Sequence, residues 1–275
     1  MKRIGKVLLL AEQNMHSSMK EVARIAEKSE LELVKKGAEA GIVIGGDGTF
    51  GFYGSRLNLP LLFVGRGKHS ELGSKGVLAE VHLNELQKAF EALKNGEYKI
   101  ENYGRLCIKM ANLDKGETFT DVYLQRAIES NALRYELRIK TPRKMIREFA
   151  IGDGVIIAAS AGATGYFSYS DKIVSGNVFD SRKFSKIGKD EIGICHILPT
   201  YIRREGKDEK DLQALRYTVP FGSVIRIMLR RKAQARLYGV GDNRKGVSVQ
   251  QGESVEIKAC RAYTKRIKLN LDDTK

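Results

Sequence analysis

The first hundred residues alternate short apolar runs with segments of helical periodicity. Three apolar runs have the length of buried strands: residues 6–11, 41–45 and 60–65. Two further segments, residues 17–28 and 85–95, carry apolar side chains at helical spacing, and the second lies between a candidate N-cap at Asn84 and a glycine, Gly96. Strands separated by helices predict a parallel sheet, in which ligands bind at the carboxyl ends of the strands.

The pattern changes after about residue 100 to a period of two. Apolar and polar positions alternate around residues 106–110, 135–139 and 225–229, and Asp114-Lys115-Gly116 is typical of a turn. We therefore expect an α/β N-terminal domain with a parallel sheet, residues 1–98, followed by a mainly antiparallel β domain, residues 99–275.

The second apolar run ends in Gly45-Gly46-Asp47-Gly48-Thr49. Glycine weakens a strand, but it lets backbone N–H groups approach a phosphate, and a helix that starts after Thr49 would add its positive end. An ionised Asp47 in this setting can take a proton from a hydroxyl or hold Mg²⁺ through water. The alternative is a tight turn in which local N–H groups satisfy Asp47.

A second glycine-flanked aspartate, Gly152-Asp153-Gly154, opens the segment "GDGVIIAASAGATGYF". Further along this segment, Thr164 and Tyr166 supply a hydroxyl and an aromatic ring that can close over an adenine or a ribose. Arg66 lies in a glycine-rich loop after the third apolar run, which suits either a triphosphate loop or a solvated loop. Neither a Walker loop nor a dinucleotide fingerprint is present.

Composition narrows the classes of function. The chain has 48 Lys and Arg against 33 Asp and Glu, a net charge of +15, which favours anionic partners or simply a solvated Lys-rich surface. No apolar run approaches the length of a membrane span, so we expect a soluble protein. The three cysteines form no CxxC pair, which indicates a reducing cytoplasm and no structural zinc. Cys195 and His196 are adjacent and would face opposite sides of a strand, which argues against a nucleophile and base pair.

Together, "GIVIGGDGTF" and "GDGVIIAASAGATGY" resemble the NAD kinase family. That family carries GGDGT in an α/β domain, then an Asn-Glu/Asp pair, a GDGxxxxTxxGSTAY segment and a Phe-Asp-Gly turn in a largely β domain. The resemblance spans roughly residues 40–260. The corresponding positions are Gly45 to Thr49, Thr120-Asp121, Gly152 to Tyr166, and Gly241-Asp242-Asn243.

Two departures concern the adenine pocket. The family's Asn and a Ser or Thr before the glycine of GSTAY help to hold the adenine, whereas this sequence has Thr120 and Ala161 there. Thr164 and Tyr166 match the family pattern. The departures imply either a rebuilt pocket, in an archaeal style, or a different acceptor.

The resemblance implies a magnesium-dependent transfer of phosphate from ATP or polyphosphate to the adenosine-ribose 2′-hydroxyl of NAD. Asp47 would be the general base, and Gly45, Gly46, Gly48 and Thr49 would hold phosphate. The NAD-binding set would be Thr120, Asp121, Asp153, Ala161, Thr164 and Tyr166, with Arg66 and Asp242 as further candidates. No protein side chain is expected to ligate the metal directly.

The resemblance also implies a homodimer or homotetramer without a membrane partner. Two alternatives stay open. One is a kinase of another hydroxyl, because diacylglycerol and sphingosine kinases carry a similar GGDGT. The other is a non-catalytic nucleotide- or nucleic-acid-binding protein, which lacks the support of any aromatic and basic recognition motif.

Overall fold

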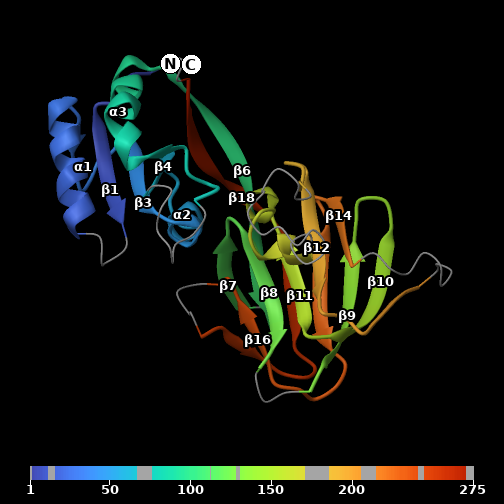
Figure 1. Cartoon of the computed structure of the whole chain (residues 1–275). Coiled ribbons are helices and arrows are strands. Elements are labelled where there is room, and N and C mark those ends of the chain that lie inside the picture. Colours follow the sequence, from blue (N-terminus) through green and yellow to red (C-terminus); the bar gives the residue numbers. More distant parts are fainter. Residues whose placement is uncertain are drawn as a thin grey trace. The chain divides into compact units, whose positions relative to one another are not determined.

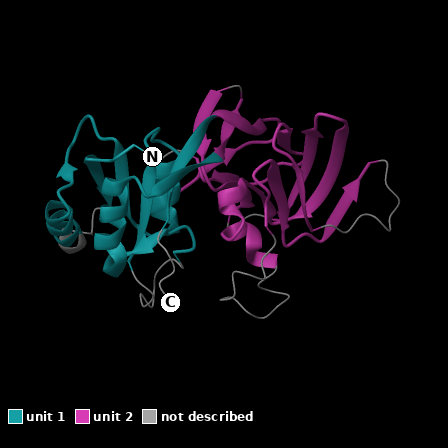
Figure 2. Ribbon diagram, turned by 90° about the horizontal axis from the view of Figure 1, so that it is seen from above, with its two compact units in different colours: residues 1–103, 262–275 teal, residues 104–261 magenta. Residues whose placement is uncertain are grey.

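The computed structural model describes residues 2–11, 16–66, 76–111, 113–127, 131–170, 186–205, 215–240 and 245–270. Contacts divide the chain into two compact units (Figure 2). Unit 1 comprises Met1–Tyr103 and Ala262–Lys275, and unit 2 comprises Gly104–Arg261. The sequence alone suggested one boundary, at residues 98–99. The compact units differ from it because the end of the chain returns to unit 1.

Unit 1 is built on a parallel sheet. Its strands and helices are β1 (Lys6–Ala11), α1 (His16–Lys28), β2 (Glu32–Leu33), β3 (Ala40–Gly45), α2 (Asp47–Gly54), β4 (Leu61–Gly65), β5 (Val81–His82) and α3 (Leu86–Asn95) (Figure 1). The strands lie in the order β2-β1-β3-β4, and β5 and the last strand, β18 (Ser254–Leu269), pair with β4. Strands β3 and β4 are buried along their whole length, as expected for strands covered on both faces.

The helices of unit 1 cover this sheet through the stripes that the sequence predicts. Val22 and Ala26 of α1 and Phe90 and Leu93 of α3 belong to one hydrophobic core with the central strands. Helix α3 ends at Gly96 in the left-handed conformation, at φ 78°. Its beginning differs from the sequence prediction, because a 3₁₀ turn over Leu83–Glu85 (η1) precedes it and includes Asn84.

Unit 2 consists of two antiparallel sheets. The first has the order β13-β10-β9-β15-β18 and the second β14-β12-β11-β8-β16-β17. The bounds of the first are β13 (Tyr201–Arg204), β10 (Met145–Gly152), β9 (Leu133–Lys140) and β15 (Val224–Leu229), with β6 (Tyr98–Met110) pairing β18 and β7 (Leu113–Thr118) pairing β6. Those of the second are β14 (Arg216–Pro220), β12 (Glu191–Ile197), β11 (Gly154–Ala158), β8 (Asp121–Arg126), β16 (Ala235–Tyr238) and β17 (Val247–Val249).

Both sheets of unit 2 contribute to one hydrophobic core. Leu137 and Ile225 come from the first sheet, and Val122, Val155 and Ile194 come from the second. Inward and outward residues alternate along β9 and β15, which is the period of two seen in the sequence. The expected α/β domain with a parallel sheet, followed by an antiparallel β domain, is therefore confirmed.

The cysteines behave differently from the sequence expectation. Cys107 of β6 and Cys260 of β18 form a disulfide with Cα atoms 5.1 Å apart, although 153 residues separate them. The spacing of cysteines along the chain could not reveal this pair, because the pairing of two distant strands brings it together. Cys195 is buried and is not part of a disulfide. No helix in the described ranges has the length and apolar character needed to cross a membrane.

Candidate functional site

The GGDGT segment joins the carboxyl end of β3 to α2. At Gly45 the backbone has φ 158°, and a Cβ there would lie 2.5 Å from Oγ1 of Thr49. Thr49 is only 5% exposed and closes over this glycine. At Gly48, by contrast, a Cβ would meet no atom of the described residues within 4 Å. The turn is therefore tightly packed at Gly45 and open at Gly48, where a ligand can approach the backbone.

Asp47 is held by backbone N–H groups from another loop. Its Oδ1 accepts a hydrogen bond from Leu78 N at 2.9 Å, and its Oδ2 accepts one from Val77 N at 3.3 Å. Helix α2 begins at Asp47 itself, whereas the sequence suggested a start after Thr49. The carboxylate thus lies in the first turn of a helix, where the helix dipole and the unpaired N–H groups favour negative charge.

The loop after β4 begins at the same edge of the sheet. Gly45 and Gly65 are paired in register at the ends of β3 and β4, and Arg66 follows directly. Arg66 is exposed. Asp242, the other further candidate, lies outside the described residues.

Three chain segments meet at Asp121 in unit 2. A Cβ at Gly162 would lie 2.4 Å from the carbonyl oxygen of Thr120, and a Cβ at Gly239 would lie 2.4 Å from that of Asp121. Gly165 faces the Asp121 carboxylate, because a Cβ there would lie 3.5 Å from Oδ2. Only glycine allows these backbones to come so close. The structure therefore brings the Thr120-Asp121 pair and the GATGY segment together.

The carboxyl group of Asp121 has a perturbed protonation equilibrium. Burial raises its pKa from the usual 3.8 to about 6, although hydrogen bonds from the backbone N–H of Tyr166 and from the Thr120 side chain oppose the shift. Part of the side chain is still accessible to solvent. A shift of this kind is common where a side chain is placed for binding or catalysis and not for stability.

A group of tyrosines surrounds this aspartate. The Tyr123 ring lies edge-on to Tyr166 and stacks on Tyr238, with 5.1 Å between ring centroids in both pairs, and Tyr166 also contacts Tyr169 at 5.8 Å. Sequence reasoning named only Tyr166. The available signal was the period of two, which places Tyr123 on the same face of β8 as Asp121. The pairing of Tyr123 with Tyr238 depends on the sheet register and had no local signal.

The second Gly-Asp-Gly turn has contacts of its own. Arg126 Nε donates to Asp153 Oδ1 at 2.6 Å, so this aspartate is part of an ion pair. Gly154 has φ 147°, and a Cβ there would lie 1.9 Å from the carbonyl oxygen of Leu124. The glycine at this position is thus required by the packing of β11 on β8.

Ala161 and Thr164 lie in the turns that follow β11. Ala161 belongs to a 3₁₀ turn over Ser160–Gly162 (η2) and is 6% exposed. Thr164 is partly exposed, and its carbonyl oxygen accepts a hydrogen bond from the Ser168 hydroxyl at 3.1 Å.

His196 belongs to a buried polar network inside unit 2. Its Nε2 lies 2.7 Å from Glu148 Oε1, and its Nδ1 lies 2.7 Å from the hydroxyl of Tyr135. Arg204 donates to the other oxygen of Glu148 at 2.7 Å. Burial raises the pKa of Glu148, but His196 and Arg204 outweigh this effect and hold it below its ordinary value. Cys195 packs in a different cluster, on the opposite face of β12, as expected for adjacent strand residues.

The chain is related in sequence to known kinases. NAD kinase of Methanopyrus kandleri is 30% identical over 147 residues, which are 52% of this chain and 50% of that protein. NAD kinase of Clostridium kluyveri is 32% identical over 146 residues, which are 51% of this chain and 46% of that protein. No protein-family model matches the chain.

Solved structures share the fold over nearly the whole chain. Yeast NADH kinase in complex with NADH superposes with a TM-score of 0.72 at 16% identity, covering 100% of this chain and 86% of that one. NAD kinase from Archaeoglobus fulgidus in complex with ATP superposes with a TM-score of 0.64 at 17% identity, covering 96% and 94%. The chain is thus similar in sequence to NAD kinases over about half of its length, and it shares their fold. In sequence it matches about half the length of the NAD kinases described above, whereas the likeness in fold extends over both units.

Proposed function

We propose that the chain is an NAD kinase, which transfers the γ-phosphate of ATP to the 2′-hydroxyl of the adenosine ribose of NAD. The observation that carries the proposal is the position of Asp47. Its carboxylate lies directly after the buried strand β3, in the first turn of α2, and two backbone N–H groups hold it in place. The similarity to NAD kinases of Methanopyrus and Clostridium supports the same assignment.

In this proposal, Asp47 accepts the proton of the 2′-hydroxyl as its oxygen forms a bond to the γ-phosphorus. The bond between that phosphorus and the β-bridging oxygen breaks, and ADP leaves with the electron pair. The transition state needs positioning and charge stabilisation more than covalent chemistry. The open backbone at Gly48, with Gly45, Gly46 and Thr49 beside it, would supply N–H groups to phosphate.

Magnesium, when bound, would neutralise charge on the phosphates of ATP. Both oxygens of Asp47 already accept backbone hydrogen bonds. This arrangement fits a contact with the ion through water better than direct ligation.

The Thr120-Asp121 pair and the GATGY segment that packs on it, together called the Asp121 turn, would recognise the dinucleotide. Asp121 can accept hydrogen bonds from ribose hydroxyls when ionised, and Tyr166 offers a ring face beside it. Thr164 is accessible for a further polar contact. Asp153 would contribute through its pair with Arg126, since that pair fixes the direction of the carboxylate.

The wider proposal is a homo-oligomeric enzyme of the cytoplasm. The Cys107–Cys260 disulfide limits the kinds of cytoplasmic protein that the chain can be. Disulfides inside cells are mainly found in redox-sensing proteins and in hyperthermophiles.

The test is an assay of purified protein with Mg²⁺, ATP and NAD, in which NADP is detected by an NADP-specific dehydrogenase. We expect NADP to form, and Asp47→Asn to lower kcat by about 10²- to 10⁴-fold, the usual range for loss of a general base. Glu32→Gln is the matched control, because it neutralises a carboxylate that is 61% exposed on the same unit. Parallel reactions with polyphosphate and with NADH would define the donor and the acceptor.

Two results would count against the proposal. Unchanged turnover in folded Asp47→Asn would remove this residue from the mechanism. Absence of NADP with both donors, together with consumption of ATP in the presence of another alcohol, would favour a kinase of a different hydroxyl.

A further inference from the structure

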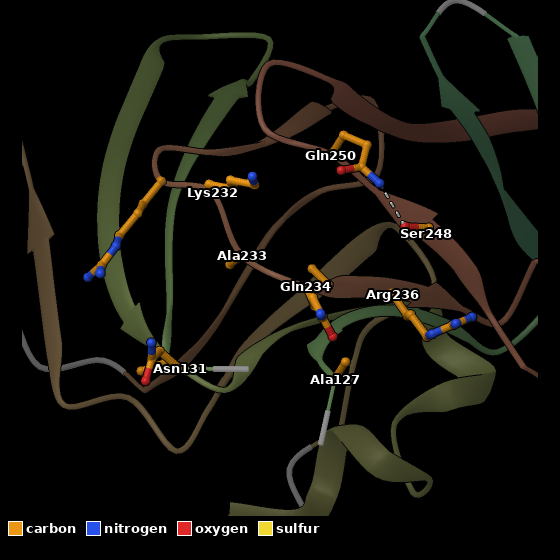
Figure 3. A pocket seen from close by; sticks show the side chains of 11 residues that line it. Ala127, Asn131, Lys232, Ala233, Gln234, Arg236, Ser248 and Gln250 are labelled. Atoms are coloured by element: carbon orange, nitrogen blue, oxygen red, sulfur yellow. Dashed lines mark hydrogen bonds between the residues drawn. The ribbon is translucent and has the colours of Figure 1, made fainter. Parts of the chain in front are cut away.

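A cavity of about 420 Å³ opens in unit 2, away from the Asp121 turn (Figure 3). It is lined by the segment that leads into β16, by the end of β17 and by residues on either side of the loop between β8 and β9. In the view of Figure 3, Asn131 lies on one side of the cavity, Arg236 on the other and Gln250 above. A volume of this size suits a small molecule such as a nucleotide or a phosphorylated metabolite.

The lining of this cavity is cationic. Arg231, Lys232 and Arg236 all line it, and the lining residues that the structure describes include no Asp or Glu. Within the described part of the chain, none of these three side chains has a carboxylate oxygen within 4.0 Å. Neighbouring cations on this surface do form such pairs, for example Arg230 with Glu136 at 3.3 Å. The three positive charges therefore share one concave surface without a counter-ion among the described residues, which raises the local concentration of anions.

Polar groups of fixed geometry accompany the charges. Arg236 Nη1 donates to the carbonyl oxygen of Lys245 at 3.0 Å, which orients the guanidinium group and leaves its charge uncompensated. Ser248 lies opposite Arg236 in the register of β16 and β17, and the Gln250 amide donates to its hydroxyl at 3.1 Å. Arginine forks and amide or hydroxyl donors together form the usual chemistry for binding phosphate oxygens.

The cavity and the Asp121 turn lie at opposite ends of the same two strands. Strand β8 runs from Asp121 to Arg126, and its partner β16 runs antiparallel from Ala235 to Tyr238. Ala235 lines the cavity, whereas Tyr238 stacks on Tyr123 beside the turn. At about 3.3 Å per residue, the two ends of β8 are roughly 17 Å apart. The cavity is thus a separate place from the residues assigned above to the dinucleotide.

We propose that this cavity, lined by Arg231, Lys232 and Arg236, binds a small anion that carries two or more phosphate groups. The ligand class follows from the charge of the lining, its donor geometry and its volume. The proposal is independent of the kinase activity, because it uses none of the residues assigned to phosphoryl transfer.

The test is calorimetric titration of the intact protein with inorganic pyrophosphate. The variant is the double change Arg231→Gln and Lys232→Gln, which removes two charges whose side chains make no hydrogen bond or ion pair with the described residues. The matched control is Lys140→Gln with Arg143→Gln, which removes two exposed cations elsewhere on unit 2.

We expect saturable binding to the unmodified protein and a Kd at least about tenfold weaker in the cavity variant, since charge-assisted hydrogen bonds are lost. The control should bind as the unmodified protein does. A rise in salt from about 50 to 200 mM should also weaken binding, because the site is exposed. Equal affinity in the cavity variant and the unmodified protein, equal weakening in both double variants, or no saturable binding would each overturn the proposal.

Discussion

Replacing Asp121 by asparagine should stabilise unit 2 at neutral pH, although it changes a residue assigned to binding. Asparagine has almost the same shape, and its Oδ1 can still accept a hydrogen bond from the Tyr166 backbone or the Thr120 side chain. What the change removes is the cost of keeping a negative charge in a poorly solvated place.

The size and pH dependence of this effect follow from the pKa of Asp121. The folded-state pKa of about 6 lies above the ordinary 3.8, so the folded protein binds the proton more tightly than the unfolded chain. Each pKa unit corresponds to about 1.4 kcal/mol, so the ionised side chain costs up to about 3 kcal/mol of folding free energy. This penalty is absent below about pH 3.8, grows between the two pKa values and is complete above about pH 6.

Urea denaturation at pH 8 and at pH 4 would measure this effect. We expect Asp121→Asn to exceed the unmodified protein in free energy of unfolding by about 1–3 kcal/mol at pH 8, with most of the difference lost at pH 4. Asp114→Asn is the control, because Asp114 is an exposed residue of β7 in the same unit. A difference at pH 8 that is zero, or that persists unchanged at pH 4, would refute the electrostatic argument.

Two further pairs of substitutions, each a test with its control, probe the scaffold of unit 2 by the same denaturation assay. Glu148→Gln should cost about 3 kcal/mol, because it removes the buried carboxylate that pairs with Arg204 and His196. This contribution is present above about pH 4.5 and lost as the pH falls through the depressed pKa of Glu148. Glu256→Gln, in a pair whose arginine is 58% exposed, should cost less than about 1 kcal/mol, and equal losses in the two glutamine variants would contradict the reasoning. Gly154→Ala should cost at least about 2 kcal/mol, because its Cβ would lie 1.9 Å from the Leu124 carbonyl oxygen. Gly222→Ala is the control, because the atom nearest to its Cβ would be 3.7 Å away. Similar stability of the two alanine variants would show that the strands adjust.

Periodicity predicts the elements of this fold well where one local pattern decides the structure. Helix α3 has its apolar stripe and its terminal glycine where the sequence places them. The turn expected at Asp114-Lys115-Gly116 fails, because these residues lie within β7. There Gly116 pairs with Ile108, and the register shifts between Ile108 and Lys109. Glycine next to a polar residue suits a bulge as well as a turn, and only the partner strand distinguishes the two.

In the candidate site, too, local patterns predict some features and contacts between distant segments decide the others. Asp47 lies in a short glycine-rich motif that residue types and spacing are enough to find, whereas Asp121 is assigned through the resemblance to the NAD kinase family. The contacts that define their chemistry come from distant segments: Leu78 for Asp47, and Gly239 for Asp121. Such contacts depend on sheet order and register, which one sequence does not encode in any local pattern.

The two departures from the NAD kinase pattern have different structural consequences. Thr120 keeps a hydrogen-bonding side chain, and it uses this side chain to support the Asp121 carboxylate. Ala161 is buried and has no polar atom, so it cannot replace the hydroxyl that the family pattern places there. If this turn binds the dinucleotide as proposed, its recognition of the base relies on Asp121, on backbone groups and on the ring of Tyr166. Since ring stacking distinguishes bases poorly and a ribose contact not at all, we expect the chain to discriminate less strictly among adenine, hypoxanthine and guanine dinucleotides than a kinase with the full motif.

Comparison of kcat/KM for NAD and its hypoxanthine analogue, in this protein and in Ala161→Ser, would test this expectation. A ratio near one that rises in the serine variant would support it, and a large ratio unaffected by the substitution would contradict it.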